Sequence, residues 1–407
     1  MTARSSRSRA ERGFAATVSN NSRTPRLRRG ATGPVLALIV LGCDGGAPAP
    51  ASGSAMGRLS AGAGHTCMIE RGGGVSCWGS NADGQLGDGT ETDSPVPERL
   101  TGLAGIRGVA TGSYHTCALA GDGGVFCWGW NVGGQVGDGT IDNRLMPFQV
   151  PGLASIAAIA MGSYHSCALH GDGTRGESCW GQNTYGQLGS GSDVNSGDPV
   201  GVFSLPPSTA IAAGGRHSCA LLVDRTVQCW GGNDVGELGD GTMDAHAFPE
   251  PVTGIAGATA IATGFNHSCA LLADRTVQCW GGNDYGQLGN GTKSGSPLPV
   301  PVGGLTGAVA IAAGYNHNCA VLEDGSVQCW GSDTAGQLGD GSTYDSVVPI
   351  PVPSLSGVTA IAGGSFHTCA ASADGTVACW GSNDSGQLGD GTTTGRSTPA
   401  PVAGVVL

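Results

Sequence analysis

The sequence has little charge and few aromatic side chains, and it lacks an apolar stripe of helical period. Of its 407 residues, 12% are charged and 5% are aromatic, whereas 75 are glycine and 21 are proline. Glycine recurs every few residues, and no apolar positions repeat at the 3.6-residue spacing of a helix. These absences exclude helical repeats. The composition is typical of a turn-rich all-β protein and differs from that of a disordered chain.

The apolar run near the N-terminus is too short to span a bilayer. It covers residues 35–41, whereas a transmembrane helix needs about 20 apolar residues. Residues 1–43 contain eight arginines and one acid, Glu11. A basic segment followed by a short apolar run predicts a secretory signal peptide.

This predicted signal peptide ends in V-L-G-C, which resembles the bacterial lipobox. The resemblance implies that Cys43 is lipidated and becomes the mature N-terminus. A secreted form without lipid, with Cys43 incidental, is the alternative. Residues 44–56 are rich in Gly, Ala, Pro and Ser and are predicted to form a flexible spacer.

Basic residues are scarce beyond the predicted signal peptide. From residue 44 onward the chain has 11 basic and 30 acidic residues, a net charge of −19. A body this acidic repels phosphate backbones, so nucleic-acid binding is disfavoured. The acidic composition is explained by a need for solubility outside the cell. The alternative interpretation is an acidic docking surface for a partner.

Seven copies of one pattern fill the rest of the chain. Each copy contains G-x-x-H-x-C, then V-x-C-W-G or a close variant, then a variant of G-Q-L-G-D-G. The period is 50 residues, apart from one step of 52. Periods of about 20 to 50 residues are typical of solenoids, propellers and arrays. The repeat histidines are His65, His115, His165, His217, His267, His317 and His367.

The fifth copy predicts four short strands, over 258–262, 269–272, 277–280 and 297–302, separated by Gly, Asn and Asp turns. Four strands in about 50 residues match one blade of a β-propeller. We therefore expect residues 57–407 to form one all-β domain, a seven-bladed β-propeller with four strands per blade. The C-terminal segment 399–407 either completes the blade begun by 57–62 or lies in a separate blade.

The cysteines, apart from Cys43, occur as two per repeat. In the fifth copy a hairpin folded at Asp274 places Cys269 opposite Cys279, close enough for a disulfide. The third copy has two extra residues between its cysteines, and an even insertion keeps them opposed. Export supplies the oxidising compartment that disulfides need. The predicted pairs are Cys67 with Cys77, Cys117 with Cys127, Cys167 with Cys179, Cys219 with Cys229, Cys269 with Cys279, Cys319 with Cys329 and Cys369 with Cys379.

The repeated tryptophans, histidines and aspartates receive structural interpretations. Each tryptophan after the second cysteine faces the opposite side of its strand and should fill the core between blades. One histidine per blade predicts seven equivalent hydrogen bonds to backbone. The Asp of G-D-G predicts a tight turn, with calcium binding as the alternative. The tryptophans are Trp78, Trp128, Trp180, Trp230, Trp280, Trp330 and Trp380.

Catalytic and metal sites are not predicted. A histidine and a cysteine on one strand face, with the second cysteine opposite, could form a soft-metal triad, but each would lack a fourth protein ligand. Catalysis needs an asymmetric group of residues, which the repeat does not supply. We therefore expect neither an enzyme nor a cofactor.

The pattern H-x-C-A-L, D-G-x-V-x-C-W-G and G-Q-L-G-D-G-T resembles the repeat of the regulator of chromosome condensation family. The resemblance covers residues 57–407 and implies a seven-bladed propeller. Family members include a nuclear guanine-nucleotide exchange factor, a plant ultraviolet photoreceptor, ubiquitin-ligase modules and a secreted bacterial inhibitor of β-lactamases. The photoreceptor has tryptophan before the repeat histidine, where this chain has Gly64, Tyr114, Tyr164, Arg216, Asn266, Asn316 and Phe366.

The repeats differ most in the segments that follow G-D-G-T, such as 140–148 and 242–250. Variable loops on a rigid scaffold are where binding usually occurs, although drift of an unselected surface is the alternative. The candidate binding residues are Trp130, Arg144, Phe148, His246 and Phe248.

The sequence thus predicts an exported, lipid-anchored or secreted bacterial binding scaffold. It would be monomeric and would recognise an extracellular or cell-surface protein or glycan through the variable loops, which should emerge on one rim of the ring. It would contact membrane only through its lipid. A guanine-nucleotide exchange factor and a carbohydrate-active surface enzyme are the alternatives.

Overall fold

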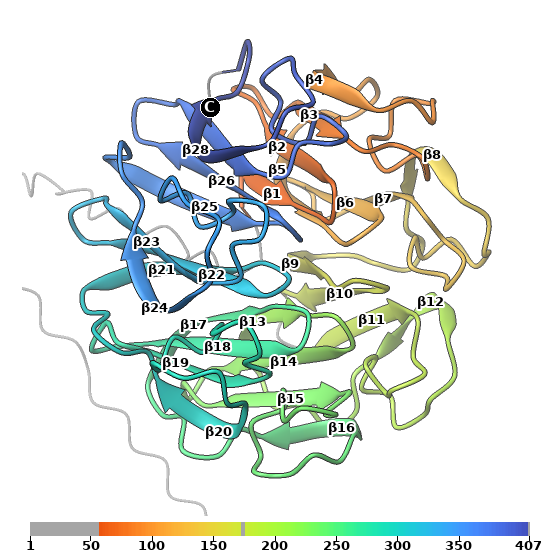
Figure 1. The fold of residues 1–407 in the computed structure, drawn as a ribbon. Coiled ribbons are helices and arrows are strands. Elements are labelled where there is room, and N and C mark those ends of the chain that lie inside the picture. Colours follow the sequence, from red (N-terminus) through yellow and green to blue (C-terminus); the bar gives the residue numbers. More distant parts are fainter. Residues whose placement is uncertain (1–56, 172–175, 406–407) are drawn as a thin grey trace, which may run out of the picture. The chain divides into compact units, whose positions relative to one another are not determined.

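The computed structural model describes residues 57–171 and 176–405, and all their regular elements are β-strands (Figure 1). The strands form seven sheets of four antiparallel strands each. The predicted all-β, seven-bladed propeller is therefore confirmed. In these residues there is no helix of the length and apolarity that a membrane span requires.

The first four blades follow one another along the chain. The first contains β1 (Leu59–Ala61), β2 (His65–Ile69), β3 (Val75–Gly79) and β4 (Ser94–Arg99). The second contains β5 (Ile106–Thr111), β6 (His115–Ala120), β7 (Val125–Gly129) and β8 (Arg144–Gln149). The third contains β9 (Ile156–Met161), β10 (His165–His170), β11 (Glu177–Gly181) and β12 (Ser196–Gly201). The fourth contains β13 (Ser208–Ala213), β14 (His217–Leu222), β15 (Val227–Gly231) and β16 (His246–Pro251).

The last three blades repeat this order. The fifth contains β17 (Ala258–Thr263), β18 (His267–Leu272), β19 (Val277–Gly281) and β20 (Ser296–Pro301). The sixth contains β21 (Ala308–Ala313), β22 (His317–Leu322), β23 (Val327–Gly331) and β24 (Ser346–Pro351). The seventh contains β25 (Val358–Gly363), β26 (His367–Ser372), β27 (Val377–Gly381) and β28 (Arg396–Pro401). The four strands predicted in the fifth copy are all present.

The two ends of the propeller lie in separate blades, which settles the question that the sequence left open. β1 belongs to the first sheet and β28 to the seventh. The ring closes where β1 contacts β25 and β26. The amide of Ser365 donates a hydrogen bond to the carbonyl of Gly62 across this junction, at 3.1 Å.

The strand register divides the loops between two faces of the ring. In the fifth blade Thr263 pairs with Ser268, His267 with Gly281, and Gly281 with Ser296, so these strand ends lie at one edge. We call this edge the mouth face, and it carries the loops between first and second and between third and fourth strands. The opposite edge, the hairpin face, carries the second-to-third-strand hairpins and the links between blades.

The core consists of apolar layers between neighbouring blades, in which the disulfide of one blade packs with the tryptophan of the next. Between the fifth and sixth blades, Cys269, Cys279 and Leu271 form one cluster with Trp330. All seven repeated tryptophans are fully buried, as predicted. Gly289 has a φ of +66°, and a Cβ there would lie 2.8 Å from Trp330 Nε1, so glycine is required at this contact.

The paired cysteines lie directly opposite each other in all seven blades. The third pair stays in register despite its longer hairpin. The Cα atoms of the bonded pairs are 4.0 to 4.1 Å apart. Each predicted disulfide is confirmed, namely Cys67 to Cys77, Cys117 to Cys127, Cys167 to Cys179, Cys219 to Cys229, Cys269 to Cys279, Cys319 to Cys329 and Cys369 to Cys379.

Candidate functional site

Each blade interface contains one polar network, and the repeat histidine belongs to it. His65 Nε2 lies 2.9 Å from Thr116 Oγ1 of the next blade. Thr116 Oγ1 and Trp128 Nε1 both donate to the Gln85 carbonyl, at 2.9 Å each. The predicted histidine bonds to backbone are therefore wrong, because the partner is a side chain of the next blade. The other pairs are His115–Ser166, His165–Ser218, His217–Ser268, His267–Asn318, His317–Thr368 and His367–Thr66.

The fifth interface shows which histidine nitrogen carries the proton. His267 Nε2 lies 3.0 Å from Asn318 Oδ1, while Asn318 Nδ2 donates to the Gln287 carbonyl at 2.7 Å. Because an amide oxygen only accepts, Nε2 is the protonated nitrogen. The Nδ1 atoms of all seven repeat histidines are buried without a hydrogen-bond partner. Burial lowers the pKa of His267 to about 4 and of His65 to about 3, so these side chains are neutral and structural.

The mouth face carries a cavity of about 390 Å³ at its centre. Its wall comes from the loops that precede the repeat histidines and from the loops after the third strands. This volume falls in the usual range of small-ligand sites, about 300–1,000 Å³. Six aromatic residues line it, namely Tyr114, Tyr164, Phe265, Tyr285, Tyr315 and Phe366. We call these six residues, together with Trp130, the mouth aromatics.

Six of the seven mouth aromatics, all except Tyr285, form two groups on different blades. The Trp130 ring lies 6.0 Å from Tyr114 and 5.6 Å from Tyr164, both edge to face. The Tyr315 ring stacks on Phe265 at 4.0 Å and on Phe366 at 6.1 Å. Tyr114 is 39% exposed and Phe366 44% exposed. These groups offer exposed ring surface held rigid by ring contacts, as is typical of binding sites.

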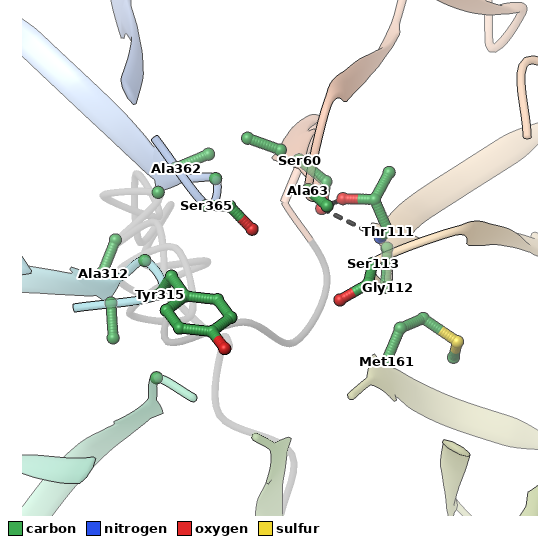
Figure 2. A pocket seen from close by; sticks show the side chains of 18 of the residues that line it. Ser60, Ala63, Thr111, Gly112, Ser113, Met161, Ala312, Tyr315, Ala362 and Ser365 are labelled. Carbon is green, nitrogen blue, oxygen red and sulfur yellow. Dashed lines mark hydrogen bonds between the residues drawn. The ribbon is translucent and has the colours of Figure 1, made fainter. Parts of the chain in front are cut away.

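A narrower cavity of about 120 Å³ lies among the first strands of all seven blades. Figure 2 shows Tyr315 and Met161 on opposite sides of this opening. Ser60 Oγ and Thr111 Oγ1, both in its wall, are hydrogen-bonded at 2.8 Å. Its volume leaves room for no more than a few solvent-sized groups, so a large ligand would stay at the mouth.

The loops around the mouth are acidic. The seven loops between third and fourth strands contain 17 Asp and Glu residues, and Lys293 is their only basic residue. Many of these acids are used locally: Asp88 Oδ1 accepts from Thr90 N at 2.8 Å, which confirms the predicted tight turn. Others face solvent, and the side chain of Asp234 is 70% exposed. Burial raises the pKa of Tyr114 and of Tyr315, so both phenols stay neutral.

The structure separates the five candidate binding residues. Trp130 belongs to the mouth aromatics and is half-buried. Arg144 and Phe148 lie on β8, an outermost strand, with the guanidinium 5.0 Å from the ring centroid. His246 and Phe248 lie on β16, where His246 Nε2 is 3.2 Å from Asp240 Oδ2. They therefore form no single site, and the last four stay predictions for the outer strands.

Sequence reasoning missed the mouth aromatics as a group. The two positions before each repeat histidine vary, and aromatic residues occur there in five of the seven repeats. In the sequence alone, three of them, Tyr114, Tyr164 and Phe366, show only that the tryptophans of the photoreceptor are absent. The variation at these two positions, within repeats that otherwise hardly change, was the signal that could have pointed to a binding site.

Cys43, the predicted signal peptide and the spacer lie outside the described residues. Within the described ranges, no group of three His, Cys, Asp or Glu side chains could hold a metal ion. The cysteines of the alternative soft-metal triads are disulfide-bonded there.

Family models match almost the whole propeller. An RCC1-like domain model matches residues 178–406. A model of the regulator of chromosome condensation (RCC1) repeat matches 72–119 and 122–169, and a second one matches 58–85, 106–135 and 156–187. No curated protein matches the chain.

Several solved structures share this fold. Human WBSCR16 is 24% identical with a TM-score of 0.74, and the match covers 81% of this chain and 94% of that one. Yeast RCC1 (Prp20), solved bound to Kap60, is 20% identical with a TM-score of 0.72, covering 94% and 91%. The ectodomain of the Physcomitrella patens receptor kinase CR4 is 21% identical with a TM-score of 0.53, covering 80% and 74%. At these identities the likeness concerns the fold alone, whereas the domain model spans more than half of the chain; the protein belongs to the regulator of chromosome condensation repeat family.

Proposed function

We propose that the protein is an exported binding scaffold, anchored through lipid on Cys43, that recognises a cell-surface protein or glycan at its mouth face. The observation that carries this proposal is the 390 Å³ cavity walled by six aromatic residues at the centre of a rigid ring. Aromatic side chains supply large contact area at low entropic cost. Contacts from the outer strands, including Phe148 and Phe248, would extend the binding surface.

Export is supported by the cysteines. Seven buried disulfides, one per blade, are typical of proteins that fold in an oxidising compartment. Metabolic labelling with a palmitate analogue tests the anchor. Label should appear on the wild type and be lost in Cys43→Ser, with the protein moving from the membrane fraction to the medium. Recovery of the wild type in the cytosol with free thiols would contradict export.

Binding is tested by comparing faces of the same ring. The non-reduced protein is immobilised and exposed to a cell-surface extract, beside the variants Tyr114→Ala/Phe366→Ala at the mouth and Val223→Ala on the hairpin face. We expect a ligand that the wild type and Val223→Ala retain and the mouth variant loses. Equal retention by all three proteins would contradict a mouth site.

Nucleotide exchange is the second candidate function. Prp20p from Saccharomyces cerevisiae, 22% identical to this chain, binds Gsp1p and histones. The acidic loops of the present mouth face would repel nucleic acid, but they do not argue against a GTPase partner. A fluorescent-nucleotide release assay with a small GTPase distinguishes the two functions, and accelerated release would favour exchange over the scaffold role.

A further inference from the structure

One cationic side chain of the protein itself lies among aromatic rings on the mouth face, beside the cavity. Arg216 precedes the repeat histidine of the fourth blade, and its guanidinium carbon lies 4.6 Å from the centroid of Tyr185. The same carbon lies 6.0 Å from the centroid of Phe265, one of the mouth aromatics. Arg216 Nη1 is 3.8 Å from Asp234 Oδ2. Two rings and one carboxylate thus surround this guanidinium.

A second carboxyl group in the same loop interacts with Arg216. Glu237 stands where the other six repeats have glutamine, and it is 2% exposed. Its Oε2 accepts a hydrogen bond from Val235 N at 3.0 Å. Burial raises the pKa of Glu237, whereas the hydrogen bond and the Arg216 charge lower it. The surroundings of Arg216 therefore combine rings from the third and fifth blades with acidic groups of the fourth, which is the chemistry that binds a guanidinium.

The fifth and seventh blades carry some of the same acids and rings without a basic residue at the position of Arg216. Asp284 and Asp384 occupy the position of Asp234, and both are exposed. Asp284 is followed by Tyr285, a mouth aromatic that is 38% exposed. In the seventh blade, Phe366 stands at the position of Arg216 and faces solvent. The loops 62–64, 112–114, 162–164, 264–266, 314–316 and 364–366, at the equivalent of 214–216, contain no charged residue.

From these observations we infer that the mouth binds the arginine and lysine side chains of a basic polypeptide segment of its partner. This inference rests on the proposed binding function and narrows its ligand class. Arg216 shows that a guanidinium fits between the rings and the acid, and no residue at the equivalent positions of the other blades carries a charge that would compete with an incoming one. The 17 acids of the surrounding loops would also steer a basic segment toward the mouth.

Arg216 also makes the inference testable by a gain of affinity, because it competes with the ligand for Tyr185 and Asp234. The probe is a hexa-arginine peptide, with hexaglutamate and the neutral sugar maltohexaose as comparisons, measured by isothermal titration calorimetry. Removing Arg216 frees one guanidinium site, so Arg216→Ala should bind hexa-arginine about two- to fivefold more tightly, the usual gain from one exposed cation–π contact.

Arg275→Ala is the matched control. Arg275 lies in the hairpin between β18 and β19, on the opposite face, and pairs with Glu323. Its loss changes the net charge as much as the loss of Arg216 but leaves the mouth intact. Equal gains in both variants would mean that hexa-arginine responds only to net charge, which would overturn the inference. Weaker binding by Arg216→Ala would also overturn it.

The acids supply the second arm of the test. Asp234→Asn/Asp284→Asn/Asp384→Asn keeps the side-chain shape and should weaken hexa-arginine binding about tenfold at low salt, an effect that salt reduces. Unchanged binding would contradict the inference. If maltohexaose bound at the mouth and hexa-arginine did not, the inferred ligand class would be contradicted, but the proposed binding function would not. If a Tyr114→Ala/Phe366→Ala variant bound every ligand as the wild type does, the proposed function would be contradicted as well.

Discussion

The mouth face and the hairpin face rest on the same seven blades but differ in the residues they display. The mouth loops carry 17 acids, one lysine and the mouth aromatics. On the hairpin face, the six links between blades carry no charge, and the seven hairpins contain eight acids and four arginines. Part of this difference is structural, because acids such as Asp88 hold the turns of the mouth loops. The exposed acids, such as Asp234, and the mouth aromatics are the part that turn geometry does not explain.

The largest expected effect is a loss of folding stability at low pH, and it arises at the blade interfaces that lie behind both faces. The repeat histidines have a pKa of about 3 to 4 in the folded chain, against 6.5 when exposed. The unfolded chain therefore takes up protons first, and the free energy of unfolding should fall as pH drops from 6.5 towards 4. Up to seven protons are involved, each costing about 1.4 kcal/mol per pH unit.

Denaturant unfolding at several pH values, without reductant, measures this slope. His267→Gln keeps an N–H donor for Asn318 and should lower the slope by about one proton. His267→Asn, which is too short to reach Asn318 in the same way, should lower the slope equally but cost more stability at neutral pH. A wild-type uptake of fewer than two protons would show that the histidines are charged or solvated in the folded ring.

Two tryptophans, one in a blade interface and one at the mouth, allow the effect on stability to be compared with the effect on binding. Trp280 is fully buried at the fourth interface, whereas Trp130 is half-buried at the mouth. Trp280→Ala should cost about 3–5 kcal/mol of stability, as large-to-small core substitutions do. Trp130→Ala should cost clearly less stability and weaken ligand binding instead. Equal stability losses in chemical denaturation would contradict the division between interface and mouth.

Two buried glutamates, one near each face, should have a smaller effect on folding stability. Glu177 on β11 replaces the valine found in the other repeats, and its Oε2 has no hydrogen-bond partner. Burial raises its pKa to about 8, above the ordinary 4.5, so the native state loses stability as pH rises from 4.5 to 8. Glu177→Val should therefore stabilise the protein by about 1–3 kcal/mol, and more at pH 8 than at pH 5.

Glu237, near the mouth, serves as the comparison because it has both a hydrogen bond and Arg216. Glu237→Gln restores the residue of the other repeats and should change thermal stability much less than Glu177→Val does. Thermal melts at pH 5 and pH 8 measure both variants. A destabilised Glu177→Val protein would mean that its carboxyl group has a structural role in the third blade.

The smallest effect is expected on the outer strands. Phe248 is 45% exposed and contacts Phe203, with ring centroids 5.3 Å apart. Phe248→Ala should change the affinity for a mouth ligand less than about twofold, whereas Tyr114→Ala should weaken it about tenfold, as central aromatic residues do in other interfaces. Titration of the two variants against one ligand checks this order. A larger loss in Phe248→Ala would move the centre of binding to the outer strands.

The sequence could predict contacts within one repeat but not those between repeats. Cys269 and Cys279 belong to one hairpin, so their opposition follows from counting residues. The partner of His267 lies 51 residues away on the next blade, and only the closed ring brings Asn318 to it. The mouth aromatics are farther apart still. Tyr114 and Tyr315 become neighbours of one cavity because seven blades share one axis, which no single repeat records.

Site-specific photocrosslinking tests the central claim, that the mouth face is the binding face, most directly. A benzophenone amino acid is placed at position 114 or 366 at the mouth, or at position 223 on the hairpin face, where Val223 is 64% exposed. Irradiation on intact cells should yield the same adduct from positions 114 and 366 and none from 223. An adduct from position 223 alone, or equal adducts from all three positions, would contradict the account.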